Sequence, residues 1–320
     1  MEKVQKAVDE KKTLITNLKN EISKVVIGQE DMINKTLIGI FTGGHILLEG
    51  VPGLAKSLTV NTLSKVFGLS FSRIQFTPDL LPSDIIGTEI YHEKTGEFKT
   101  KIGPVFRNFI LADEINRAPA KVQSALLESM QEKQVTISDT TYKLDNPFLV
   151  IATQNPLEQD GTYPLPEAQQ DRFMMKLNIG YPKKSEERQI LEMTIKNQEP
   201  ENTELNAIIT KEQVFEIKEL IHNIYLDDRL KEYILDIIFK TREANPYIEC
   251  GASPRAGINL IKAAKAKAFL DGRAYVMPDD IRDVVYDILR HRLILTYEAE
   301  AENLKVEQII AKLLDEIVLP

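Results

Sequence analysis

Short apolar runs that end in polar or turn residues constrain the fold of this chain more than any other feature. Four such runs are "HILLEG" from His45, "FSRIQFTP" from Phe71, "FILADEIN" from Phe109 and "PFLVIATQNP" from Pro147. A fifth candidate is "FMMKLNIGYP" at 173–182, and the intervening segments place apolar residues at helical spacing, notably over 57–67 and 118–134. This alternation predicts an α/β fold with a parallel five-stranded sheet covered by helices on both faces.

Three further segments extend this outline. Apolar residues recur at helical spacing over 4–41 except at Gly28, which predicts two helices joined by a turn. Two strand-like pieces within Glu89–Lys101 predict a β-hairpin inserted into the sheet domain. After Pro182 the patterns are almost all helical, with helices expected at 211–226, 229–245, 254–270 and 278–293. We therefore expect a sheet domain at 1–184 and an all-helical domain at 185–320.

The composition narrows the partners and the location. The chain has 320 residues, of which 43% are hydrophobic, and its net charge of -8 gives no basic footprint for duplex DNA. Its charged N-terminus is unlike a signal peptide, and no run approaches the ~20 apolar residues that span a bilayer. We expect a cytoplasmic protein without membrane insertion. The single cysteine, Cys250, is expected to pack as a small apolar side chain.

The stretch "GVPGLAKS", Gly50–Ser57, joins the first strand to a helix and is typical of a phosphate-binding loop. Gly50 supplies the sharp exit from the strand, and Gly53 is suited to a positive φ. The strict pattern G-x-x-x-x-G-K-[ST] has glycine where this chain has Ala55. We expect Ala55 to have entered the helix with a negative φ, where alanine is favoured. Lys56 would then reach the β- and γ-phosphates, and Ser57 would ligate Mg²⁺.

Two other strands deliver polar groups to the edge of the sheet where parallel α/β folds bind ligands. "FILADEIN" ends in Asp113, predicted to hold Mg²⁺, and Glu114, predicted to polarise the attacking water. "IATQNP" ends in Thr153, Gln154 and Asn155, and an amide there could orient that water. Taken singly, each motif is also compatible with a plain strand end or turn.

Two arginines are candidates for neutralising charge in a phosphoryl-transfer transition state. Arg172 precedes the last strand in "EAQQDRF", and Arg255 lies in the first turn of a helix in "GASPRAG". Considered singly, each is also compatible with an ordinary solvated side chain.

From about Ile22 to Leu293 the chain resembles AAA+ ATPases, and within them the MoxR group. The motifs that carry the resemblance are "GVPGLAKS", "FTPDLLPSDIIG", "GPVFRNFILADEINRAP", "QSALLESMQE", "IATQNPLEQDGTYPLPEAQQDRF" and "GASPRA". The resemblance implies a P-loop αβα sandwich followed by a helical lid, assembled as a ring that is usually hexameric, with ATP between subunits. One departure is Arg107, where members often have a small residue.

The resemblance also implies roles for individual residues. Glu114 is similar to the catalytic glutamate, Asn155 to the sensor in the same subunit, and Arg172 to the finger donated to a neighbour. Arg255 matches the lid's second sensor, and Arg117 is a candidate for the subunit interface. Glu89–Lys101 resembles the helix-2 insertion of this clade. The predicted nucleotide contacts are Val26, Ile27 and Gly28 beside the adenine, then Gly50, Val51, Pro52, Gly53, Leu54, Ala55, Lys56, Ser57, Leu58 and Asp113.

By the same resemblance, the chain is expected to be a Mg²⁺-dependent ATPase that remodels, matures or activates client proteins. Partners with a von Willebrand A-type domain are common in the group. One alternative is a nucleic-acid motor. The negative net charge argues against it, as does the lack of a strand that combines aromatic and basic side chains. Another is a nucleotide-gated scaffold without hydrolysis. A further one is the ATPase subunit of a metal chelatase, and only the identity of the client would distinguish that subunit from the expected ATPase.

Overall fold

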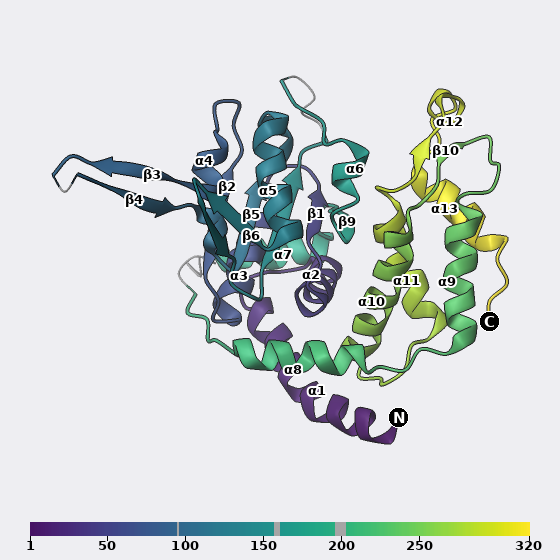
Figure 1. Cartoon of the computed structure of the whole chain (residues 1–320). Coiled ribbons are helices and arrows are strands. Elements are labelled where there is room, and N and C mark those ends of the chain that lie inside the picture. The colour runs from purple at the N-terminus through teal and green to yellow at the C-terminus, as the bar shows by residue number, and fades with distance from the viewer. Residues whose placement is uncertain (95, 157–160, 196–202) are drawn as a thin grey trace.

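The five apolar runs form one parallel β-sheet in the computed structural model, which describes residues 1–94, 96–156, 161–195 and 203–320 (Figure 1). The strands are β1 (Ile46–Glu49), β2 (Phe71–Gln75), β5 (Phe109–Asp113), β8 (Leu149–Gln154) and β9 (Met175–Asn178). Their order across the sheet is β2-β5-β8-β1-β9, and each neighbouring pair is parallel. The predicted α/β sheet is confirmed, including its candidate fifth strand.

Alternate residues of the central strands pack into two cores, as the period of two in a strand requires. Leu47, Ile110 and Val150 belong to a core with α4 (Pro82–Ile86) and α5 (Ala120–Glu132). Their neighbours in the strands belong to a second core with α1 (Glu2–Ser23), α2 (Glu30–Thr42) and α3 (Lys56–Val66). The predicted apolar face of α5 is confirmed, because its buried residues include Val122, Leu126, Leu127 and Met130.

Among the described residues after β9, the elements are helices, as predicted, together with one short ribbon. Its helices are α7 (Lys184–Ile195), α8 (Lys211–His222), α9 (Asp228–Lys240), α10 (Pro254–Leu270), α11 (Pro278–Leu289), α12 (Tyr297–Ala301) and α13 (Val306–Asp315). The ribbon pairs β10 (Ile248–Cys250) with β11 (Ile294–Leu295), strands too short to give a detectable alternation. The second core continues into α8–α11. In the described residues, no helix is both long and apolar enough to cross a bilayer.

Two antiparallel hairpins extend from the sheet domain. The predicted one is confirmed as β3 (Gly87–His92) and β4 (Glu97–Ile102), and it projects from the body of the molecule (Figure 1). The second, β6 (Gln134–Ile137) with β7 (Thr140–Lys143), was not predicted. The hairpin begins at Gln134, where the helix expected over 118–134 was predicted to end. The observed helix ends earlier, at Glu132, because Lys133 adopts a positive φ of 53°. The remaining short elements are η1 (Pro104–Phe106), η2 (Ile115–Arg117) and α6 (Glu167–Gln170).

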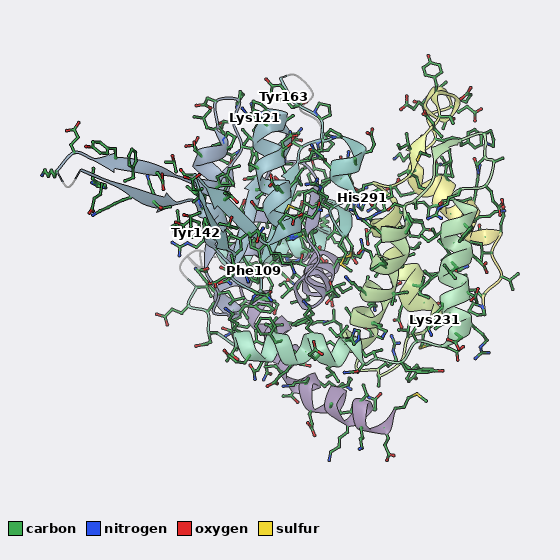
Figure 2. All side chains as sticks on the ribbon, in the orientation of Figure 1. Phe109, Lys121, Tyr142, Tyr163, Lys231 and His291 are labelled. Carbon is green, nitrogen blue, oxygen red and sulfur yellow. The ribbon has the colours of Figure 1, made fainter. Side chains whose placement is uncertain are left out.

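Three consecutive residues after α11 hold the helical part against the sheet. Arg290 donates a hydrogen bond to the carbonyl oxygen of Lys176. His291 and Arg292 both reach the carbonyl oxygen of Phe173, at 3.1 and 2.6 Å. The Arg292 side chain is only 1% exposed, so its charge is stabilised by these contacts rather than by water. Figure 2 shows His291 at the boundary between the sheet and the helices.

The prediction that Cys250 packs as a small apolar side chain was wrong. Cys250 is exposed at the end of β10, where only Ile248 of the three strand residues is buried. The physical reason is that a two-stranded ribbon at the surface buries few of its side chains.

Two buried histidines make stability depend on pH. Burial lowers the pKa of His45 to about 4, while its Nδ1 accepts a hydrogen bond from the Val150 N–H at 2.9 Å. His291 is likewise buried, which lowers its pKa. Because the folded-state pKa of each histidine lies below the unfolded value, these two side chains become protonated mainly in the unfolded chain as the pH falls below about 6.5. The folded state therefore loses stability.

We therefore expect the variant His45→Asn to lose less thermal stability than the wild type between pH 7 and pH 5. Asparagine can accept the same hydrogen bond but does not titrate, which removes a destabilisation of about 2 kcal/mol at pH 5. The measurement is the melting temperature of both proteins at both pH values. An equal loss in both proteins would contradict the assignment, since His291 is unchanged in the variant.

Candidate functional site

The loop Gly50–Ala55 connects β1 to α3 and bends at both predicted glycines. A Cβ added to Gly50 would lie 2.9 Å from the carbonyl oxygen of Ile179, so the backbone passes too close for a side chain. Gly53 has φ +85°, and nothing lies within 4 Å of the position that a Cβ would take. The conformation requires glycine there, and the space over the loop is open.

The expected conformation of Ala55 was wrong. Its φ is +55° and its ψ is 19°, so it is the left-handed N-cap of α3 rather than a residue inside the helix. Closing the loop onto the helix imposes this conformation, which costs an alanine about 1–2 kcal/mol more than a right-handed one. Ala55 therefore keeps the turn that the glycine of the strict pattern would adopt, with one added methyl group.

The phosphate loop from Pro52 onward, both carboxylates and the candidate sensor amide line a single cavity of about 390 Å³, whereas Gly50 and Val51 do not line it. The lining residues are Pro52, Gly53, Leu54, Ala55, Lys56, Ser57, Leu58, Arg73, Gln75, Asp113, Glu114 and Asn155. The Lys56 ammonium donates to the carbonyl oxygen of Gly50 at 2.6 Å. Burial lowers the pKa of Lys56, and the nearby charges of Asp113 and Glu114 oppose that shift.

Thr153 fixes the two carboxylate residues relative to each other. Its hydroxyl donates to Asp113 Oδ1 at 2.6 Å and accepts the backbone N–H of Glu114 at 2.8 Å. Thr153 lies at the end of β8, the neighbour of β5. Glu114 itself has φ +54°, which turns the chain sharply after the strand.

Sequence reasoning missed Arg73 and Gln75, two residues of β2 that line the same cavity. Arg73 forms an ion pair with Asp113 at 2.6 Å, and the Gln75 amide donates to Glu114 Oε2 at 2.9 Å. Both residues alternate with buried Ile74, so the period of two could have placed them on one polar face of the strand. Arg117 also pairs with this carboxylate, with 3.3 Å between its Nη1 and Glu114 Oε2.

The two candidate arginines lie elsewhere. Arg172 and Arg255 line a second cavity of about 260 Å³, and among the described residues none lines both this cavity and that of the phosphate loop. Asp171, the residue before Arg172, connects this segment to the helical part. Its carboxylate pairs with Arg255 at 3.1 Å and with buried Arg292 at 2.7 Å. The segment that carries Arg172 is thus attached to the first turn of α10 and to the end of α11.

The residues predicted beside the adenine do not line the phosphate cavity. Val26 is buried, and Gly28 has φ +68° with the Glu186 carboxylate 2.8 Å from the position of an added Cβ. The position that a Cβ added to Gly50 would take is likewise close to Ile179. The turn and the phosphate loop therefore both pack against the segment 179–186, which brings them to one region of the surface.

The residues of the phosphate cavity fit a nucleotide with Mg²⁺. A hydroxyl from Ser57 and a carboxylate from Asp113 are oxygen ligands, and Mg²⁺ is commonly held by one or two such groups together with substrate phosphates. The open space at Gly53 leaves the backbone of the loop accessible to phosphate oxygens.

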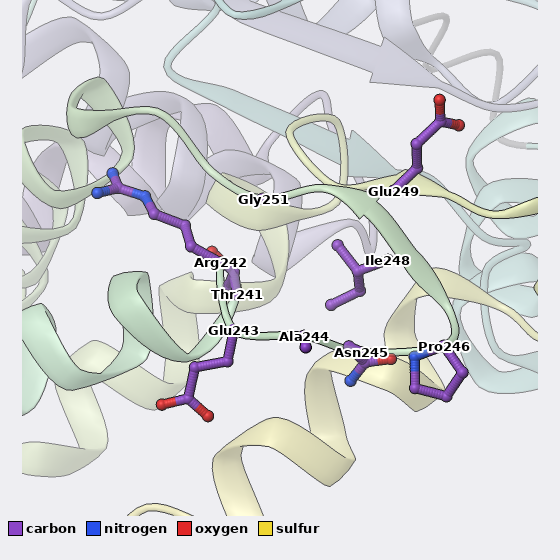
Figure 3. Close-up of a pocket in the computed structure, with 9 residues that line it drawn as sticks. All are labelled: Thr241, Arg242, Glu243, Ala244, Asn245, Pro246, Ile248, Glu249 and Gly251. Carbon is purple, nitrogen blue, oxygen red and sulfur yellow. The ribbon is translucent and has the colours of Figure 1, made fainter.

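A larger cavity of about 480 Å³ in the helical part lacks this convergence. It lies at the loop between α9 and β10, and Figure 3 shows the charged side chains of Arg242, Glu243 and Glu249 extending in different directions. Arg242 is already engaged, with its Nε donating to the carbonyl oxygen of Ala252 at 2.9 Å. The phosphate cavity is therefore the better candidate for chemistry.

Comparisons with known proteins show which family the chain belongs to. The model of the ATPase family associated with various cellular activities (AAA) matches residues 45–175, and the AAA lid domain matches residues 240–313. The chain is 46% identical over 308 residues to Chaperone MoxR1 of Mycobacterium tuberculosis, across 94% of this chain and 81% of that protein.

Two more relatives extend the comparison. Protein MoxR of Methylorubrum extorquens is 29% identical, and the alignment covers 86% of each chain. A crystal structure from Cytophaga hutchinsonii, described as a candidate ATPase, superposes with a TM-score of 0.90 at 54% identity. That comparison covers 100% of this chain and 98% of the other.

The site predicts that binding and turnover of ATP can be separated by two substitutions. In Glu114→Gln, ATP should still bind but turnover should fall about 100-fold or more, because only the group that polarises water is lost. In Lys56→Ala, ATP affinity should fall roughly 10- to 100-fold, because a charged phosphate contact is lost. Titration with ATP and steady-state phosphate release measure the two effects.

Matched controls are Glu128→Gln on α5 and Lys65→Ala on α3, whose side chains are exposed. Both controls should behave as the wild type. Normal turnover in Glu114→Gln, or unchanged ATP affinity in Lys56→Ala, would show that this cavity is not the nucleotide site.

Proposed function

Because the chain belongs to the MoxR group of AAA+ ATPases, we propose that it hydrolyses ATP with Mg²⁺ at sites shared between the subunits of a homo-hexameric ring. The observation that supports this most directly is the division of the candidate residues between two cavities. Lys56, Asp113 and Glu114 line one, while Arg172 and Arg255 line the other. Residues 1–184 are then the nucleotide-binding domain and residues 185–320 its lid.

Within one subunit, the loop and Lys56 bind the phosphates of ATP. Ser57 and Asp113 would hold the Mg²⁺, which would supply positive charge next to the phosphate oxygens. Glu114 accepts a proton from the attacking water, and Asn155, which is 7% exposed in the same cavity, orients that water. Thr153 keeps the water-polarising and metal-holding residues in register through its two hydrogen bonds.

Between subunits, Arg172 and Arg255 supply positive charge to the nucleotide of a neighbouring copy. Their cavity lies apart from the phosphate loop of their own chain, so a second copy is needed to complete the site. Arg255 is half exposed and paired with Asp171, a geometry from which it can turn toward an approaching phosphate. Such an added arginine can raise the rate of phosphoryl transfer by 10³ or more, in order-of-magnitude terms.

We further propose that ATP turnover drives the remodelling or activation of a protein client in the cytoplasm, with a von Willebrand A-type protein as a partner. The support is the similarity to a protein named as a chaperone. The net charge of -8 gives no support to a nucleic-acid substrate.

The shared site predicts that two inactive variants restore activity when mixed. Arg172→Ala keeps an intact phosphate loop and Glu114, while Glu114→Gln keeps an intact Arg172. In mixed oligomers some interfaces combine the intact halves, so ATP hydrolysis should recover to a fraction of the wild-type rate. The measurement is phosphate release after subunit exchange, with two affinity tags to verify that mixed oligomers have formed.

The control mixture is Glu114→Gln with Lys56→Ala. Both defects affect the phosphate-loop half of the site, so no interface is restored and the mixture should remain inactive. Verified mixed oligomers of Arg172→Ala and Glu114→Gln that stay inactive would contradict a shared site.

A further inference from the structure

Asp113, the predicted metal ligand, already accepts three hydrogen bonds from two other side chains. Arg73 Nη2 and Nε both donate to its Oδ2, at 2.6 and 3.1 Å. Thr153 donates to its Oδ1 at 2.6 Å. Two donors on one oxygen occupy the positions of its two lone pairs, so a metal ion could reach Oδ2 only if Arg73 moved.

The position of Arg73 in the fold permits that movement. Arg73 lies on β2, which is an edge strand of the sheet, and its side chain is 52% exposed, whereas that of Asp113 is 13% exposed. The core contacts of the strand are made by other residues, buried Ile74 and partly buried Phe71. The guanidinium can therefore leave Asp113 without disturbing the packing beneath the strand.

Arg73 is also connected to the second carboxylate of the site. Its Nη2 donates to Gln75 Oε1 at 2.9 Å, and Gln75 Nε2 donates to Glu114 Oε2 at 2.9 Å. A hydrogen-bonded series thus runs from Asp113 through Arg73 and Gln75 to Glu114. Displacing Arg73 removes one of the two contacts that orient the Gln75 amide toward Glu114.

We propose that Arg73 is a positioning residue that competes with Mg²⁺ for Oδ2 of Asp113, occupying that oxygen until Mg²⁺ arrives with the nucleotide. The two cations would use the same lone pairs of Oδ2, and their mutual repulsion at such distances adds to the competition. The inference rests on the proposed nucleotide function and adds a residue that the predicted site did not contain.

The experiment measures the affinity of the full-length protein for fluorescently labelled ADP, in Mg²⁺ and in EDTA. The quantity of interest is the factor by which Mg²⁺ tightens binding. ADP is used because it has no γ-phosphate that could attract the displaced Arg73. In EDTA, Arg73→Gln leaves the negative charge of Asp113 uncompensated beside the nucleotide, which weakens ADP binding. In Mg²⁺, the same variant lacks the cation that competes with the metal, which strengthens ADP binding. Both effects increase the factor, by about 3- to 10-fold.

Two further variants make the result interpretable. Arg107→Gln removes an exposed arginine of the sheet domain and should leave the factor unchanged. Arg73→Lys keeps a cation beside Asp113 and should give a factor between those of the wild type and Arg73→Gln. Melting temperatures of the variants verify that each is folded.

The outcomes separate this inference from the function on which it rests. Clear ADP binding with an unchanged or smaller Mg²⁺ factor in Arg73→Gln would overturn the role of Arg73 alone. Absence of ADP binding by the wild type in both conditions would overturn the nucleotide function together with it. A larger factor in Arg73→Gln, with Arg107→Gln unchanged, would support the competition.

Discussion

The alignment of the carboxyl ends of β1, β5 and β8 is the constraint on which the candidate site depends. Because neighbouring strands are parallel, the phosphate loop after β1, the carboxylates after β5 and the polar end of β8 meet at one edge of the sheet. Thr153 then bonds to Asp113 and to the backbone of Glu114 across the β5–β8 pair. A change of register between these strands would separate the groups that must act together.

A second constraint is the attachment of the helical part through Asp171 and Arg292. Burial lowers the pKa of Arg292, and the Asp171 carboxylate opposes that shift, so the pair stabilises the charge where water cannot. Removing Asp171 would leave the buried Arg292 charge without its carboxylate partner, which is strongly destabilising. Since Arg255 contacts the same carboxylate, Arg172 and Arg255 both lie at the connection between the lid and β9. The geometry links lid position to both candidate arginines.

Much of this arrangement could be predicted from the sequence because it follows local periods. The strands that end at Glu49, Asp113 and Gln154 were each marked by a buried run and polar residues after it. The conformation of Ala55 could not be predicted, because pattern alone does not decide whether the last loop residue is left-handed or already helical. The prediction for Cys250 was wrong because cysteine is usually buried, whereas this one lies in a ribbon at the surface and is exposed.

Features that depend on the order of strands were beyond the sequence pattern. Arg73 and Gln75 reach the carboxylates only because β2 pairs with β5, although a hairpin and other elements separate the two strands along the chain. The grouping of Arg172 with Arg255 depends in the same way on how α10 packs against the end of the sheet domain. Resemblance to a family could name these two arginines, whereas their common cavity required the structure.

In the proposed function, one subunit does not contain a complete catalytic site. The most direct measurement is the ATP hydrolysis rate per subunit over a wide range of protein concentration with Mg²⁺, with the size of the particles determined in the same samples. We expect activity per subunit to rise with the fraction of assembled subunits and to be negligible in samples that contain only monomers. Monomers that hydrolyse ATP as fast per subunit as the assembled form would contradict a shared site.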